Sequence, residues 1–217
     1  MGNGNLKEIK FLVLSDLHGR VNHYFIEEIN DMHDFNAVMI LGDITHFGPA
    51  KIVKDVSTKD ITIFAIPGNC DPPEILNSMN ESEIVNMHKN TFVFSDYKIV
   101  GLGGTDFSNV SMGIVFSDNE AFEFLNKNLD EKTILMLHQP PYGILDEING
   151  KHVGNKGIRR AVDEKRPFVV MFGHIHENAG KYYDGKTLFF NPGPAKDGRY
   201  AILKIFNGKA DVEFFKR

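Results

Sequence analysis

Short apolar runs alternate with helix-like segments over the first third of the chain. The runs at residues 9–14, 37–41 and 61–66 are rich in β-branched and large aliphatic side chains, a composition typical of buried strands. Between the first two runs, residues 21–32 carry apolar side chains near helical spacing, and a second helix is expected to begin near Pro49. Strands that alternate with helices form parallel sheets, so this part of the chain predicts a parallel β-sheet with crossover helices.

The middle of the chain has shorter and more closely spaced strand candidates. A short helix is expected to begin at Pro72, because proline is well suited to the first turn of a helix. The runs at 84–87, 91–94 and 97–102 follow this helix and are separated by short polar turns. Such spacing is typical of neighbouring antiparallel strands, so the three runs are predicted to form a meander.

The second half of the chain returns to alternating helices and strands. Helices are predicted near 118–129, with Ser117 or Asp118 as the N-cap, and near 155–164, after a glycine-rich loop at 142–154. Strand candidates in this half lie at 133–137 and 168–172, with edge or antiparallel strands at 187–190, 199–206 and 210–215. The whole pattern predicts a single domain over residues 1–217, in which two mixed sheets pack face to face with helices outside.

Most of the predicted strands are followed by polar residues of the types that bind metal ions. In chain order these residues are Asp16, His18, Asp43, Asn69, His138, His174 and His176. A lone aspartate or histidine at a strand end is usually a cap or a turn residue, but that interpretation does not explain seven of them in this arrangement. If the strand ends converge on one edge, the set can hold two divalent ions, and paired ions indicate phosphate-ester chemistry.

The composition limits the classes of function. Of the 217 residues, 42% are hydrophobic and 24% are charged, which is ordinary for a globular protein with a sizeable core. The formal net charge of −5 argues against a basic surface for nucleic acid. The single cysteine, Cys70, cannot form an intrachain disulfide, and no segment is apolar enough for a signal sequence or a membrane span. A cytoplasmic protein without membrane attachment is expected, and its oligomeric state is left open.

Several short motifs, in this order along the chain, resemble those of the calcineurin-like metallophosphoesterase superfamily. They are Asp16-Leu17-His18, Gly42-Asp43, Gly68-Asn69-Cys70-Asp71, His138 and Gly173-His174-Ile175-His176. The resemblance implies an α/β fold, namely a four-layer α/β/β/α sandwich of two mixed β-sheets flanked by helices. It also implies an enzyme that hydrolyses phosphoric esters at a dinuclear metal centre.

The resemblance further implies which residues bind each ion. One ion would be held by Asp16, His18, Asp43 and His176, and the other by Asp43, Asn69, His138 and His174. Asp43 would then bridge two ions about 3.5–4 Å apart, with a bridging hydroxide as the nucleophile. Mixed nitrogen and oxygen ligands suit Mn²⁺, which is expected here, with Fe²⁺, Zn²⁺ or Ni²⁺ as alternatives.

Cys70 is a departure from the pattern of the superfamily. The usual motif has a histidine at this position, and a thiol is a weaker hydrogen-bond donor than an imidazolium. Chains with Gly-Asn-Cys resemble a bacterial and archaeal branch usually described as phosphodiesterases, so diester hydrolysis is predicted over monoester hydrolysis. Cys70 could also be only a small neutral spacer. His46, three residues after Asp43, could supply part of the missing acid function, or it could be a surface histidine.

The predicted function is hydrolysis of a small phosphodiester, such as a cyclic nucleotide, with Asp43, Asn69, Cys70 and His46 as the candidate catalytic residues. The alternatives are a phosphomonoesterase or a nuclease of the same fold, or a non-catalytic metal-binding scaffold subunit. Specificity is expected to reside in the loops at 107–116 and 142–156, whose sequences do not identify the substrate.

Overall fold

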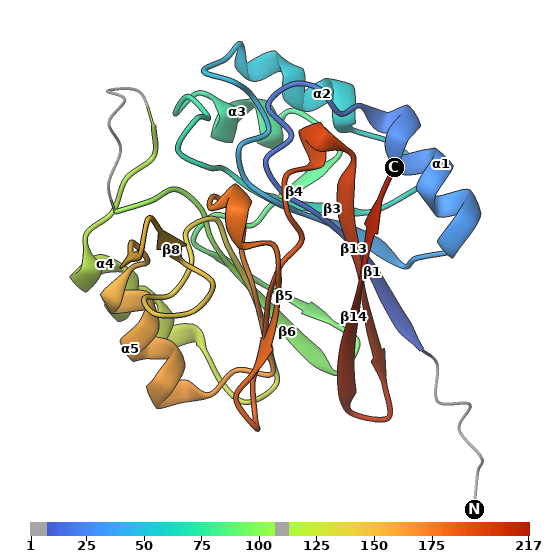
Figure 1. The fold of residues 1–217 in the computed structure, drawn as a ribbon. Coiled ribbons are helices and arrows are strands. Elements are labelled where there is room, and N and C mark those ends of the chain that lie inside the picture. Colours follow the sequence, from blue (N-terminus) through green and yellow to red (C-terminus); the bar gives the residue numbers. More distant parts are fainter. Residues whose placement is uncertain (1–7, 107–112) are drawn as a thin grey trace, which may run out of the picture.

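Two six-stranded β-sheets pack face to face in the computed structural model, which describes residues 8–106 and 113–217 (Figure 1). The first sheet contains β1 (Ile9–Leu14), β2 (Ala37–Leu41), β3 (Ile63–Ile66), β4 (Ile84–Asn86), β13 (Arg199–Phe206) and β14 (Lys209–Lys216). The second contains β5 (Asn90–Phe94), β6 (Tyr97–Leu102), β7 (Thr133–Leu137), β10 (Val169–Met171), β11 (Gly180–Tyr183) and β12 (Leu188–Asn191). The strand orders are β14-β13-β1-β2-β3-β4 and β11-β12-β10-β7-β6-β5.

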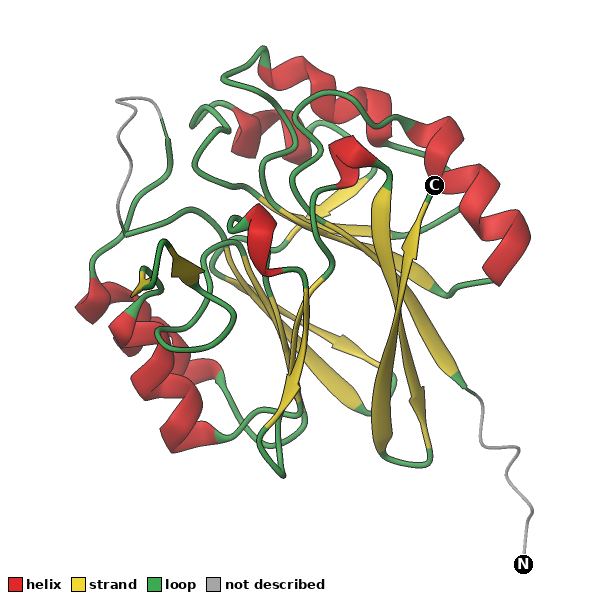
Figure 2. Cartoon of the chain, in the orientation of Figure 1, coloured by secondary structure: helices red, strands yellow, loops and turns green. Residues whose placement is uncertain are grey.

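Helices cover the outer face of each sheet (Figure 2). Those over the first sheet are α1 (His23–His33), α2 (Val53–Val56) and α3 (Ile75–Asn80), and those over the second are α4 (Asp118–Asn128) and α5 (Lys156–Lys165). Single 3₁₀ turns occur at η1 (Ala50–Ile52), η2 (His176–Asn178) and η3 (Ala195–Asp197). This arrangement confirms the predicted four-layer α/β/β/α sandwich.

Alternating side chains of each central strand enter two different cores. Along β1, Phe11 and Val13 pack between the two sheets, whereas Leu12 and Leu14 pack under the helices of the first sheet. Successive side chains of a strand point to opposite faces, and both faces of this sheet are covered. The continuous apolar runs in the sequence follow from this double burial.

The parallel strands of both sheets end at the same edge of the sandwich. Strands β1 to β4 are mutually parallel, as are β6, β7, β10 and β12. A parallel bridge joins Ser15, just after β1, to Pro194, and the amide of Gly173, just after β10, donates to the carbonyl O of His138 at 3.1 Å. The loops that follow these strands therefore meet between the two sheets.

The predicted three-stranded meander is wrong for its first strand. β4 pairs in parallel with β3 in the first sheet, while β5 and β6 form an antiparallel hairpin in the second. The chain crosses between the sheets after β4, because the amide of Met87 donates to Ala65 and the amide of Lys89 donates to Gly101. A short apolar run has the same pattern in either sheet, so spacing alone favoured the wrong pairing.

The predicted loops, edge strands and helix N-cap of the second half agree with the structure only in part. The predicted loop at 142–154 contains a small antiparallel pair, β8 (Glu147–Ile148) and β9 (Lys151–His152). Edge strand β11 was not predicted, and it makes β12 an inner strand that pairs in parallel with β10. The N-cap of α4 is confirmed as Ser117, whose Oγ accepts from the amide of Glu120 at 3.2 Å. The specificity loop predicted at 107–116 falls partly on residues 107–112, which lie outside the described residues.

Within residues 8–106 and 113–217, no helix combines the length and the apolar character that crossing a bilayer requires.

A partly buried histidine at the crossover between the sheets predicts a pH dependence of stability. His88 Nδ1 accepts the amide of Gly103 at 3.2 Å, and burial lowers the pKa of His88 from 6.5 to about 4. Between these values the unfolded chain binds more protons than the folded one, so the free energy of unfolding falls as the pH drops from 6.5 to about 4. The His88→Gln variant lacks this contribution, and we expect its stability to fall less over that range, by at most about 3 kcal/mol.

Urea unfolding of both proteins in EDTA, at several pH values from 4.5 to 7.5, measures this difference. Two stability curves that run parallel over the whole range would show that His88 titrates normally in the folded protein.

Candidate metal centre

All seven candidate ligands lie in the segments that follow parallel strands, with His176 as the first residue of η2. Asp16 and His18 follow β1, Asp43 follows β2, Asn69 follows β3, His138 follows β7, and His174 and His176 follow β10. The convergence inferred from the sequence is therefore present in the fold, with ligands from the first sheet facing ligands from the second.

One half of the cluster is built around Asp16. The candidate ligand atoms of Asp16, His18 and His176 lie within 4.8 Å of one another, and His176 Nε2 is 3.2 Å from Asp16 Oδ1. His18 Nε2 is 3.8 Å from Oδ2 of Asp43. These four residues are the set that the family resemblance implies for one ion.

The other half is built around His138. Its Nε2 lies 3.5 Å from Oδ1 of Asp43 and 3.0 Å from Oδ1 of Asn69. The rings of His138 and His174 are in edge contact, with centroids 5.1 Å apart. The two oxygens of Asp43 thus face histidines in different halves, which is the arrangement of a bridging carboxylate.

The donor atoms fit a pair of divalent cations. Oδ1 of Asp16 and Nε2 of His18 are buried and have no hydrogen-bond partner within the described part of the chain. Buried polar atoms are normally satisfied, because leaving one unpaired costs about 1–3 kcal/mol. Two ligands at right angles on one ion, each about 2.1 Å away, lie about 3 Å apart. The Asp16–His176 and Asn69–His138 distances of 3.2 and 3.0 Å match this spacing.

The two buried carboxylates of the cluster respond differently to their surroundings. Burial raises the pKa of Asp43, and the charge of Asp16 adds to the rise although His138 opposes it. Burial acts on Asp16 in the same direction, but contact with His176 and the charge of His138 outweigh it and hold the pKa of Asp16 below its usual range. The ionised form of Asp43 is therefore unfavourable in the metal-free protein, and a cation would relieve this.

The histidines of the cluster are held mainly in the form that binds metals. Burial lowers the pKa of His18 to about 4 and that of His174 to about 3. Both rings are then neutral at pH 7, with a lone pair free for a cation. Burial acts on His138 in the same direction, but the charges of Asp43 and Asp16 overcome it and raise its pKa.

The backbone of the cluster is strained at several ligands. Asp16, His18, Asp43 and His174 have φ values of 55°, 47°, 51° and 68°. The left-handed region is unfavourable for residues with a side chain, and such strain concentrates at functional sites. Four ligands in this conformation indicate that the surrounding structure holds the loops in place.

One contact explains a glycine in the motifs. A Cβ atom on Gly68 would lie 2.1 Å from Oδ1 of Asp43. The Gly68-Asn69 loop must approach Asp43 this closely for the carboxylate of Asp43 and the side-chain amide of Asn69 to face the same histidine, His138, and only glycine permits it.

A buried carboxylate beside the ligands joins two of these loops. Asp71 Oδ1 accepts the amide of Thr45 at 2.7 Å, and its Oδ2 accepts the amides of Ile44 at 3.1 Å and Gly68 at 2.8 Å. Asp71 thereby fixes the loop of Asp43 relative to the loop of Asn69 without contributing a ligand.

A second polar network lies beside the site and was missed by sequence reasoning. The carboxylate of Asp106 accepts from the side-chain amides of Gln139 and Asn155, and the amide of Asp106 donates to Oε1 of Gln139 at 2.9 Å. These residues join the loops after β6 and β7 to the start of α5. Each is a single polar residue without a motif, so the only sequence signal was that Gln139 follows His138.

Both candidate catalytic residues outside the ligand set lie against the cluster. The amide of Cys70 donates to Oδ1 of Asp43 at 2.8 Å, and burial together with the charge of Asp43 raises the pKa of the Cys70 thiol, so it stays protonated. His46 is exposed, and its Nδ1 is 3.3 Å from Nδ1 of His18. Potential ligand atoms of His18, His46 and Cys70 lie within 4.8 Å of one another.

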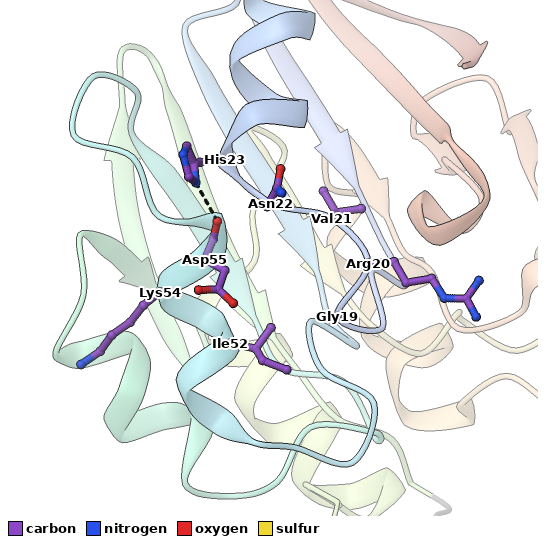
Figure 3. A pocket seen from close by; sticks show the side chains of 8 residues that line it. All are labelled: Gly19, Arg20, Val21, Asn22, His23, Ile52, Lys54 and Asp55. Carbon is purple, nitrogen blue, oxygen red and sulfur yellow. Dashed lines mark hydrogen bonds between the residues drawn. The ribbon is translucent and has the colours of Figure 1, made fainter.

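A polar pocket of about 340 Å³ adjoins the loop after His18 (Figure 3). It lies between the start of α1 and the η1–α2 segment, and the Nδ1–H of His23 donates to the carbonyl O of Asp55 at 3.1 Å. In Figure 3 the side chain of Arg20 points away from His23 and Asp55. None of the seven candidate ligands is among the described residues that line this pocket.

Comparison with known proteins places the chain in a family. The sequence model described as calcineurin-like phosphoesterase matches residues 9–178. The UPF0046 protein K07C11.7 of Caenorhabditis elegans is 30% identical over 69 residues, which are 32% of this chain and 24% of the worm protein. The matching segment thus spans about a quarter of that relative's length.

Solved structures share the fold at low sequence identity. The protein TT1561 of Thermus thermophilus has a TM-score of 0.69 at 16% identity, over 95% of this chain and 99% of its own. A dimetal phosphatase from Danio rerio has a TM-score of 0.70 at 11% identity, over 96% of each chain. A further solved structure has a TM-score of 0.77 at 16% identity, over 97% of this chain and 100% of its own. These likenesses show the fold alone. The sequence match over residues 9–178 shows that the chain belongs to the calcineurin-like phosphoesterases, a family of dimetal-dependent phosphoric ester hydrolases.

Proposed function

We propose that the chain is a dimetal phosphodiesterase that hydrolyses a small phosphodiester, such as a cyclic nucleotide. The observation that carries the proposal is the cluster of two carboxylates, one asparagine and four histidines between the sheets, with two buried atoms that have no hydrogen-bond partner within the described residues. An amide and neutral imidazoles beside paired carboxylates suit divalent first-row metals, of which Mn²⁺ is our first choice.

The residues of the chain divide into two ligand sets that share Asp43. One ion would be held by Asp16, His18, Asp43 and His176, and the other by Asp43, Asn69, His138 and His174. Two bound ions would supply a nucleophile from water near neutral pH and offset the charge on the phosphoryl oxygens. The ring of His138 is oriented for its role, because its Nδ1–H donates to the carbonyl O of Leu41 at 2.7 Å and directs Nε2 toward Asp43 and Asn69.

The preference for diesters rests on Cys70. Its thiol stands where most family members have a histidine, and burial keeps the thiol protonated and uncharged. A neutral S–H is a weak donor to a leaving group, which disfavours monoesters of poorly acidic alcohols. We further propose that His46, close to the thiol of Cys70, supplies part of the proton donation.

Hydrolysis of bis(p-nitrophenyl) phosphate against p-nitrophenyl phosphate tests this function. The metal-free protein is reloaded with Mn²⁺, Fe²⁺, Ni²⁺, Zn²⁺ or Mg²⁺ separately, and we expect faster cleavage of the diester with Mn²⁺. Faster cleavage of the monoester would contradict the diester preference. Two bound ions without turnover on either ester would favour a scaffold subunit. For the role of His46, a His46→Gln variant whose kcat/KM matches wild type at every pH would exclude proton donation.

A further inference from the structure

The two ring nitrogens of His18 face different surroundings. Nδ1 lies 3.3 Å from Nδ1 of His46, and the two rings meet edge to face, with centroids 5.3 Å apart and planes at 76°. Nε2 is buried without a hydrogen-bond partner among the described residues, and Oδ2 of Asp43, with which it forms an ion-pair contact, is 3.8 Å away. The side chain of His18 is only 9% exposed, so water cannot easily substitute for either contact.

A contact between two ring nitrogens restricts where their protons can be. One nitrogen must carry a hydrogen and the other a lone pair, because two lone pairs or two N–H groups would repel. If His18 donates from Nδ1, its Nε2 has a lone pair directed toward the ligand cluster. The opposite tautomer would bury an Nε2–H with no described acceptor within hydrogen-bond distance, which costs about 1–3 kcal/mol. The geometry therefore favours His18 as the donor and His46 as the acceptor.

The backbone holds His46 in place although its ring is exposed. The amide of Thr45 donates to Asp71 at 2.7 Å, and the amide of Phe47 donates to the carbonyl O of Cys70 at 2.9 Å. The residues on both sides of His46 are thus tied to the loop that follows Asn69. The ring of Phe47 also contacts the ring of His46, with centroids 4.8 Å apart.

We propose that His46 is a positioning residue for the metal ligand His18. Its Nδ1 accepts the Nδ1–H of His18 and keeps Nε2 of His18 free to bind a divalent ion. In the other half of the cluster, the carbonyl O of Leu41 accepts the Nδ1–H of His138 and orients that ring in the same way. The two halves therefore use different hydrogen-bond acceptors to direct the Nε2 atom of a histidine toward an ion. The inference rests on the proposed dimetal function. It is separate from proton donation, for which His46 would use Nε2.

Two substitutions of His46 distinguish the effect of its hydrogen-bond acceptor from the effect of its aromatic ring. His46→Phe keeps a ring but removes the acceptor, whereas His46→Asn places an oxygen near the position of Nδ1. His23→Phe is the matched control, because Nδ1 of His23 also makes a hydrogen bond, but outside the ligand cluster. ¹⁵N-histidine spectra of the metal-free proteins report the tautomer of His18, and calorimetric titration with Mn²⁺ reports the affinity of each ion.

We expect wild type, His46→Asn and His23→Phe to hold His18 with its proton on Nδ1, and His46→Phe to lose this preference. Losing a hydrogen-bond partner of a ligating histidine typically weakens metal binding about 10- to 100-fold. We expect His46→Phe to lose this affinity for one of the two ions only, and we expect His46→Asn to recover it. An unchanged tautomer and unchanged affinities in His46→Phe would overturn the proposal. Tight Mn²⁺ binding without ester hydrolysis would reject the proposed function but not this role, whereas a wild type that binds no Mn²⁺ would reject both.

Discussion

Replacing Asp43 with asparagine is expected to abolish metal-dependent hydrolysis while raising the melting temperature of the metal-free protein. The oxygens of Asp43 lie 3.8 Å from Nε2 of His18 and 3.5 Å from Nε2 of His138, so this one side chain reaches both halves of the cluster. A neutral amide cannot bridge two dications as a carboxylate does, and we expect kcat/KM to fall on the order of a thousandfold or more.

The stability of the metal-free protein should change in the opposite direction. Burial and the charge of Asp16 raise the pKa of Asp43, which means that the ionised side chain is unfavourable where it stands. Asparagine removes that charge and keeps an oxygen that can accept the amide of Cys70, 2.8 Å from Oδ1 in the wild type. The site would thus be relieved of an unfavourable charge that is retained for metal binding.

Thermal unfolding with EDTA and with Mn²⁺, beside kinetics on bis(p-nitrophenyl) phosphate, measures both effects. Mn²⁺ should raise the melting temperature of wild type, because it binds the folded state, but should raise that of Asp43→Asn much less. Asp31→Asn, which neutralises an exposed carboxylate on α1, should behave as wild type. An Asp43→Asn variant with normal activity would show that Asp43 is not the bridging ligand.

The ligand cluster was predictable because its signals are local. Each ligand comes shortly after an apolar run, as Asp43 does after β2 and His138 after β7, and parallel strands necessarily end at a common edge. The strands themselves were recognisable for the same reason, since burial on both faces leaves few polar positions within a run, such as Lys10 near the start of β1. Local patterns of this kind are visible in the sequence regardless of how distant segments pair.

Pairings between distant segments were not predictable. The runs of β4 and β5 look alike in sequence, yet they belong to different sheets, and only the backbone bonds of Met87 and Lys89 decide this. Likewise, the spacing of His46 from Asp43 suggested that it reaches the site, but its contact with His18 depends on how two loops fold together. The network of Asp106 joins three segments, none of which has a distinctive local pattern.

Gly173→Ala is expected to destabilise the protein by about 3 kcal/mol and to weaken metal binding, because forced overpacking of a closed interior costs up to this amount. A Cβ atom on Gly173 would lie 1.7 Å from Oγ and 2.7 Å from Cβ of Ser15, and 2.7 Å from Oδ2 of Asp16. Gly173 follows a strand of the second sheet, whereas Ser15 and Asp16 follow a strand of the first. The clash would therefore push apart the two loops that bring His174 and Asp16 together, and the amide of His174 would lose its bond to Oδ2 of Asp16, 3.2 Å in the wild type.

A double-mutant cycle with Ser15→Gly identifies the cause of this effect. Ser15→Gly removes both Ser15 atoms that the new methyl group would meet, so we expect it to recover part of the stability lost in Gly173→Ala, with Asp16 limiting the recovery. Gly150→Ala is the matched control, because a Cβ there meets no atom of the described residues within 4 Å and costs only the strain of a φ of +76°, about 1 kcal/mol. Urea unfolding in EDTA and calorimetric Mn²⁺ titration give the two readouts. Two results would contradict this explanation: Gly173→Ala lowers the free energy of unfolding no more than Gly150→Ala does, or the effects of Gly173→Ala and Ser15→Gly on that free energy are additive. Either would show that the close approach of the two sheets at Gly173 does not hold the metal site together.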